Sequence, residues 1–129
     1  MRLLRTLLIV LLPLVAASPS FAASFVPFDP NAFAAAQHDG KPILVDIRAS
    51  WCPTCAQQKP ILDWLSGEPE FKNLIVFMVD FDSQKDVVRA LHAQMQSTLI
   101  AFKGATETGR SVGDTNVNSI EKLLRSAAG

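Results

Sequence analysis

Short apolar runs alternate with more widely spaced apolar positions along this chain of 129 residues. Three runs, 43–48, 74–79 and 98–102, are apolar almost throughout, which is typical of strands that are covered on both faces. A shorter segment, 25–28, is a candidate edge strand, and 110–112 is a candidate hairpin partner for the third run. Together these runs predict a β-sheet with a buried centre.

Spaced apolar residues between and after the runs predict helices. Asp29 is an acidic N-cap followed by proline at the first helical position, so a helix begins there and continues to about Gln37. A second helix is expected over 53–66, and a last one begins at Asn116 or Asn118. The alternation of strands and helices indicates an α/β fold, a central mixed sheet flanked by helices on both faces.

The helix over 53–66 has a predicted inner face formed by Ile61, Trp64 and Leu65. Pro60 lies inside it and should kink it, because proline removes an N–H and crowds the preceding turn.

A third helix is expected after Ser83. Val87, Leu91 and Met95 recur every four residues there, which predicts a helix that includes all three.

Residues 1–23 have the layout of a secretory signal peptide, with two arginines, the apolar segment 7–15 and a small-x-small cleavage site. Cleavage is expected after Ala22 or Ala23. The alternative is an uncleaved membrane anchor, which is disfavoured because the apolar segment is short and Pro13 interrupts it.

Removal of this leader leaves residues 24–129, enough for one domain. Without the two leader arginines the 12 Lys and Arg fall to 10, against 12 Asp and Glu. The mature chain is therefore slightly acidic, and no basic patch predicts a nucleic-acid partner. Export predicts an oxidising compartment such as the periplasm.

The two cysteines of the chain, Cys52 and Cys55, lie between the strand 43–48 and the helix that follows. The free N–H groups and the positive end of a helix stabilise a thiolate, the reactive form of cysteine. A disulfide across so short a loop would contribute only about 2 kcal/mol of chain entropy. Redox chemistry explains the pair better than stapling does.

A lone Cys-x-x-Cys is compatible with zinc, haem or redox use, but several further features stand in register with this one. They are Ile43-Leu44-Val45-Asp46, Ala49-Ser50-Trp51-Cys52 with Cys55, Pro60, Val79-Asp80-Phe81-Asp82, Ser97-Thr98 through Lys103-Gly104, and Val112-Gly113-Asp114. In these features the chain resembles the thioredoxin family over nearly all of residues 25–127. The resemblance implies a thioredoxin-like fold.

The resemblance also implies roles for the matching positions. Cys52, at an exposed helix start, would be the nucleophile, and the more buried Cys55 would resolve the mixed disulfide, so that the two form a disulfide in turn. Asp46 matches the family's buried acid, and a carboxyl in an apolar strand tends to hold its proton, so it is a candidate for proton transfer with Cys55. The alternative for Asp46 is a solvated acid or one paired with Arg48. Trp51 would provide a flat surface beside the reactive sulfur.

Ser97 stands where the family has a cis-proline, and with Thr98 it would contact substrate. A non-proline cis bond costs about 3 kcal/mol, so we expect the bond before Ser97 to be trans. The missing ring would open space near the sulfurs and place a hydroxyl where it could bind a thiolate.

Two further positions depart from the family pattern. Arg48 replaces an aromatic residue; its charge would favour the Cys52 thiolate, or it is a solvated surface residue. Met78 stands where many members have a lysine near the buried acid, so the proton of Asp46 should be held more tightly than usual.

We therefore predict an exported, monomeric thiol–disulfide oxidoreductase that needs no cofactor and reduces or exchanges protein disulfides. A reductase in an oxidising compartment needs a supply of electrons, so a membrane thiol-transfer donor is expected. Disulfide oxidation is the alternative direction, because the Pro53-Thr54 pair does not settle it. A second alternative is a metal-binding module, in which the cysteine pair holds a soft metal or shares an iron–sulfur cluster across a dimer. A closed zinc site within one chain is not expected, since no histidine stands at ligand spacing.

Overall fold

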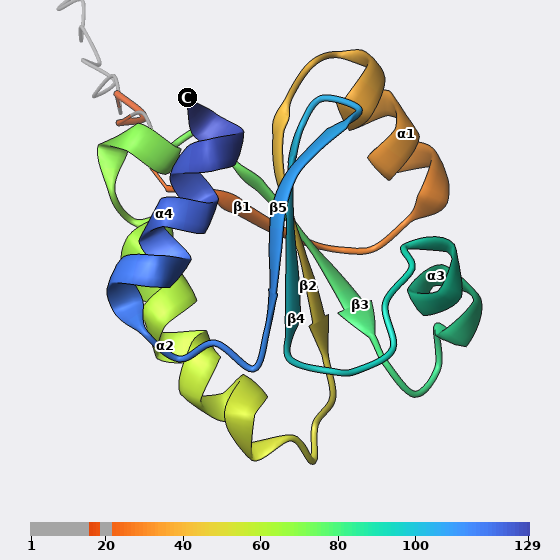
Figure 1. The fold of residues 1–129 in the computed structure, drawn as a ribbon. Coiled ribbons are helices and arrows are strands. Elements are labelled where there is room, and N and C mark those ends of the chain that lie inside the picture. The colour runs from red at the N-terminus through yellow and green to blue at the C-terminus, as the bar shows by residue number, and fades with distance from the viewer. Residues whose placement is uncertain (1–15, 19–21) are drawn as a thin grey trace, which may run out of the picture.

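A computed structural model describes residues 16–18 and 22–129 (Figure 1). Most of the predicted leader lies outside these residues, and of its cleavage site only Ala22 and Ala23 are described. In the described ranges, no helix is both long and apolar enough to cross a bilayer.

The described residues form a five-stranded mixed sheet in the order β1-β3-β2-β4-β5. β1 and β2 both run parallel to β3, and β4 runs antiparallel to β2 and to β5. The central strands are the apolar runs seen in the sequence, and the candidate edge strand lies at one edge. The strands are β1 (Ser24–Pro27), β2 (Pro42–Arg48), β3 (Ile75–Asp80), β4 (Thr98–Lys103) and β5 (Thr106–Val112).

Helices cover both faces of the sheet, α1 and α3 on one and α2 and α4 on the other (Figure 1). The α1 helix begins where predicted, since the Asp29 carboxylate accepts a hydrogen bond from the Ala32 N–H at 2.8 Å. The helices are α1 (Pro30–His38), α2 (Pro53–Ser66), a short 3₁₀ helix (Pro69–Phe71), α3 (Lys85–Ala90) and α4 (Val117–Ala128).

Successive residues of β2 point to opposite faces of the sheet, and this alternation divides the core in two. Ile43, Val45 and Ile47 pack with Phe77 on the side of α1 and α3. Leu44 packs on the side of α2 and α4. Asp46 and Arg48 share the parity of Leu44, which directs them to the face that α2 covers.

The predicted third helix is too long. α3 ends at Ala90, because His92 takes a left-handed conformation with φ of 54°. The Arg110 guanidinium from β5 donates to the carbonyls of Leu91 at 3.2 Å and His92 at 3.1 Å, which satisfies the end of the helix. Met95 therefore lies in the loop before β4 and is exposed.

The predicted inner face of α2 is also partly wrong. The helix runs unbroken from Pro53 to Ser66 through Pro60. Leu65 is buried as expected, but Trp64 is exposed. Gln58 lies in the buried position one turn after Cys55.

Candidate active site around Cys52 and Cys55

A short turn connects β2 to α2 and places the cysteine pair at the helix start. The Cys52 N–H donates to the Ala49 carbonyl at 3.2 Å, and Cys52 is the N-cap of α2. Its Sγ accepts a hydrogen bond from the Cys55 N–H at 3.1 Å. The two sulfurs are joined as a disulfide, with the Cα atoms 5.3 Å apart. The first turn of α2 contains no acidic residue, so the positive end of the helix acts on the sulfur unopposed.

The relative exposure of the two cysteines is the reverse of that expected. Cys52 is 4% exposed, whereas Cys55 is half-buried. The reason is that the Cys52 sulfur turns toward the helix, where it bonds to Cys55 and accepts the backbone N–H. Both cysteines nevertheless line an open pocket.

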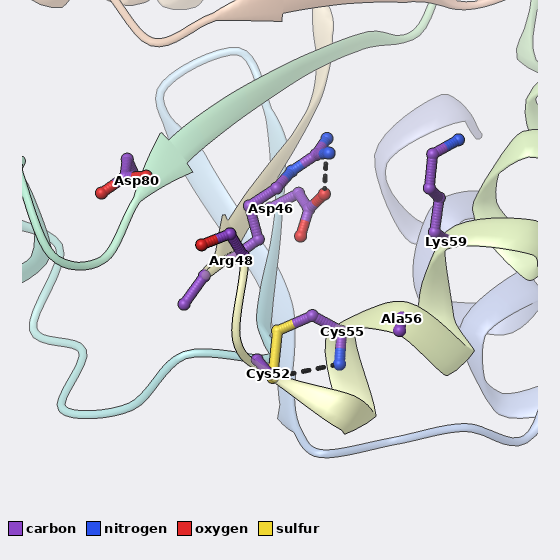
Figure 2. Close-up of a pocket in the computed structure, with 9 residues that line it drawn as sticks. Asp46, Arg48, Cys52, Cys55, Ala56, Lys59 and Asp80 are labelled. Atoms are coloured by element: carbon purple, nitrogen blue, oxygen red, sulfur yellow. Dashed lines mark hydrogen bonds and ion pairs between the residues drawn. A yellow bond between two sulfur atoms is a disulfide. The ribbon is translucent and has the colours of Figure 1, made fainter.

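This pocket of about 330 Å³ joins the disulfide to a group of charged side chains. Asp46 and Arg48 from β2, Asp80 from the end of β3 and Lys59 from α2 line it with the cysteines (Figure 2). The sequence analysis had not assigned Lys59 or Asp80 to the site. The sequence signal for Asp80 is that it ends an apolar run, as Arg48 does; the two strands are parallel neighbours, and the two residues pair in register.

Asp46 is buried and also paired, so the two alternatives considered for it hold together. An Arg48 Nη2 atom lies 3.1 Å from the Asp46 carboxylate, and the Arg48 side chain is 33% exposed. Burial raises the pKa of Asp46 above 3.8, while the charge and hydrogen bond of Arg48 oppose that shift. The carboxyl therefore holds its proton more tightly than an exposed aspartate.

Arg48 supplies the cation that position 78 does not. Met78 pairs with Asp46 across β2 and β3 and lines a second small pocket with it. No charge comes to the carboxyl from that strand position. Arg48 lies two residues further along β2 on the same face, which is why it reaches the carboxylate.

Asp80, which also lines the pocket, loses its proton more readily than an ordinary aspartate. Hydrogen bonds from the Ser83 N–H at 2.8 Å and hydroxyl at 3.0 Å, and from the Asp82 N–H at 3.0 Å, hold the pKa of Asp80 below its ordinary value. Its role is to close the turn after β3.

The bond before Ser97 is trans, as expected from its cost, and Ser97 itself has a positive φ of 55°. This left-handed conformation costs a non-glycine residue about 1 kcal/mol, so the surroundings must hold it. The Ser97 carbonyl accepts hydrogen bonds from the Gly113 N–H at 2.9 Å and the Gln58 amide at 3.2 Å. The Thr98 hydroxyl donates to the Met95 carbonyl at 2.7 Å, so it holds the loop.

Trp51 is 56% exposed beside the cysteine pair. Its indole N–H donates to the Asp82 carboxylate at 2.7 Å, a partner that the sequence analysis missed. The bond restrains the ring, and more than half of the residue stays accessible for contact.

No cluster of three or more His, Cys, Asp or Glu side chains within the described part of the chain is arranged to hold a metal ion. The pocket beside the disulfide has two carboxylates, those of Asp46 and Asp80; Arg48 pairs with the first, and hydrogen bonds from Asp82 and Ser83 bind the second.

Comparison with known proteins agrees with this geometry. The thioredoxin family model matches residues 24–126. A thioredoxin of Echinococcus granulosus is 33% identical over 100 residues, which cover 78% of this chain and 91% of that protein. A thioredoxin of Chlamydia trachomatis is 33% identical over 82 residues, covering 64% of this chain and 78% of that one.

Among solved structures, Trxlp from Edwardsiella tarda superposes with a TM-score of 0.76 at 39% identity, covering 78% of this chain and 98% of that one. The family match spans nearly the whole described domain and includes the cysteine pair at the start of α2. The chain belongs to the thioredoxin family and is a thiol–disulfide oxidoreductase.

Proposed function

We propose that this protein is exported and reduces protein disulfides in the compartment that it reaches, with Cys52 as the attacking thiolate. The observation that supports this most is the position of the disulfide at the start of α2, beside an open pocket that contains a buried acid. Reduction requires the dithiol form, in which the helix N-terminus stabilises Cys52 as a thiolate.

In the first step the Cys52 thiolate attacks one sulfur of a substrate disulfide. The substrate S–S bond breaks, a Cys52–substrate mixed disulfide forms, and the other substrate sulfur leaves as a thiolate. The flat face of Trp51 and the Ser97-Thr98 loop provide the contact surface for the substrate.

In the second step Cys55 transfers its proton to the Asp46 carboxylate and attacks the Cys52 sulfur. The mixed disulfide breaks, the second substrate thiolate leaves, and the Cys52–Cys55 disulfide forms. Two electrons have then passed from the two cysteines to the substrate. A carboxyl with a raised pKa suits this transfer, because it binds the proton more strongly than an ordinary aspartate.

Return to the dithiol form needs a reductant outside the protein. A membrane thiol-transfer protein whose own dithiol becomes a disulfide would supply the two electrons and balance the cycle. The leader-like segment 1–23 supports this location, since it matches the layout of a signal peptide. We propose that the protein acts as a monomer.

Titration of the cysteine pair against glutathione, with an insulin-reduction assay, tests the proposal. A reductase should have a potential near that of thioredoxin, about −270 mV, and Cys52→Ser should abolish turnover. A potential near about −120 mV without insulin reduction would reverse the direction to oxidation. Full activity of Cys52→Ser would refute the mechanism.

A further inference from the structure

Gln58 is a buried amide in the first turns of the helix that carries the cysteines. It is 1% exposed and is not among the residues that line the pocket with Asp46. The amide nitrogen donates to two backbone carbonyls, that of Ser97 at 3.2 Å and that of Asp114 at 2.9 Å. These carbonyls belong to two separate loops, which Gln58 ties to α2.

The buried amide of Gln58 also has a cost in stability. No donor in the described ranges reaches the Gln58 Oε1, which is buried without a partner. An unsatisfied buried acceptor is destabilising, whereas an apolar side chain of similar size would fill the space without it. Core stability alone therefore does not explain glutamine here, and the two hydrogen bonds that it donates indicate another role.

Both loops lie at the end of the sheet where the cysteines are. Thr98 pairs with Ile47 near the end of β2 and also with Val112 on β5. Ser97 therefore lies beside the segment that leads from β2 to Cys52, and Asp114 lies one strand further along the same end of the sheet. Met95, in the same loop as Ser97, and Val112, the last residue of β5, are exposed apolar residues that a polypeptide segment can contact.

We propose that Gln58 is a positioning residue for substrate docking: through its two hydrogen bonds it fixes the Ser97 and Asp114 loops against which a polypeptide segment of the substrate lies. The left-handed Ser97 cannot hold this position by a rigid ring, so hydrogen bonds from Gly113 and Gln58 hold it. The inference rests on the proposed function and deepens it. It predicts that Gln58 matters for protein disulfides and not for small disulfides, which need no docking surface.

The test compares Gln58→Met with Gln57→Met in the full chain. Methionine matches the length of glutamine but lacks its donors, and Gln57 is an exposed neighbour on the same helix. Turnover is measured with insulin and with bis(2-hydroxyethyl) disulfide, using dithiothreitol as the reductant. For Gln58→Met, KM for insulin should rise about fivefold or more, the effect of losing one net hydrogen bond, with kcat nearly unchanged. The rate with the small disulfide and both rates of Gln57→Met should match the unsubstituted protein.

An unchanged KM for insulin, or an equal loss with both substrates, would overturn the inference. If the unsubstituted protein reduces neither substrate, the proposed function fails instead. The positioning is then tested separately by amide hydrogen exchange at Gly113, whose N–H binds the Ser97 carbonyl. Exchange should be faster in Gln58→Met than in Gln57→Met, and equal rates would refute it. If Gln58→Met does not fold, Gln58→Asn, which withdraws the amide by one methylene, undergoes the same measurements.

Discussion

Replacing Asp46 by asparagine separates the cost of its buried charge from its proposed use. The side chain keeps its shape and loses its ionisable group. Burial raises the pKa of Asp46 above 3.8, with Arg48 opposing the shift. A group whose folded-state pKa is raised contributes stability that is fully present below its unfolded pKa and is lost as the pH rises through the folded pKa. At pH 7 the ionised Asp46 therefore destabilises the fold.

The magnitude follows from the burial of the pair. Asp46→Asn neutralises one member of the pair only, so the gain comes from the raised pKa of Asp46: each pKa unit by which burial raises it corresponds to about 1.4 kcal/mol of destabilisation once the group is ionised. Arg48 is one-third exposed and can turn to water once its partner is neutral. We therefore expect the free energy of unfolding of Asp46→Asn to rise by about 1 kcal/mol at pH 7, with no gain near pH 3. The rate should change in the opposite sense, because loss of a general base costs about 100-fold or more.

Urea unfolding between pH 3 and pH 8 and single-turnover reduction of insulin between pH 6 and pH 9 measure the two effects. The rate deficit should shrink as the pH rises, because hydroxide in the solvent can then accept the proton in place of Asp46. Asp86→Asn is the control, since Asp86 is exposed on α3, across the sheet from α2. A variant that is less stable at pH 7, or whose turnover is unchanged at every pH, would refute the reasoning.

Three further substitutions test other parts of the molecule. Arg48→Met removes the charge that opposes burial, so the pKa of Asp46 should rise further. The free energy of unfolding, measured in urea at pH 7, should fall by about 2 kcal/mol. This is less than the usual cost of breaking a buried ion pair, because Arg48 is partly exposed. Cys55→Ser should accumulate a Cys52–insulin mixed disulfide, seen on a non-reducing gel and absent from the Cys52→Ser, Cys55→Ser double variant. Phe33→Ala removes a ring in contact with three others; it should lower the free energy of unfolding by about 3 kcal/mol, with the activity of the folded protein unchanged.

Much of the fold was predictable because its signals are local. The apolar runs became the central strands, since a strand covered on both faces needs no polar alternation. The cap at Asp29 fixed the start of α1, because a carboxylate satisfies free N–H groups wherever they occur. The position of the cysteine pair followed from the same strand-to-helix logic.

The features that were not predicted depend on distant contacts. Met95 continues the spacing of Val87 and Leu91, yet the helix ends before it. Arg110, from a distant strand, donates hydrogen bonds to the carbonyls at that helix end. Gln58 is polar, and no local sequence signal predicts that its amide donates to carbonyls 39 and 56 residues away. The pairing of Arg48 with Asp46 was left open because strand parity allows it but does not require it.

Most of the buried polar residues in the described part of the chain lie near the disulfide. Ser66 is satisfied within its own helix by the Asp63 carbonyl. The other buried polar residues are Asp46, Gln58, Ser97 and Thr98, and all lie at the end of the sheet next to the disulfide. Each is costly to bury, and a core selected for stability alone would place apolar side chains there. Asp46 and Gln58 contribute chemistry or position, so replacing Asp46 by asparagine should maintain stability and impair the reaction, and replacing Gln58 by methionine should impair the docking of protein substrates. Substitutions in the apolar cluster around Phe33 should have the opposite effect.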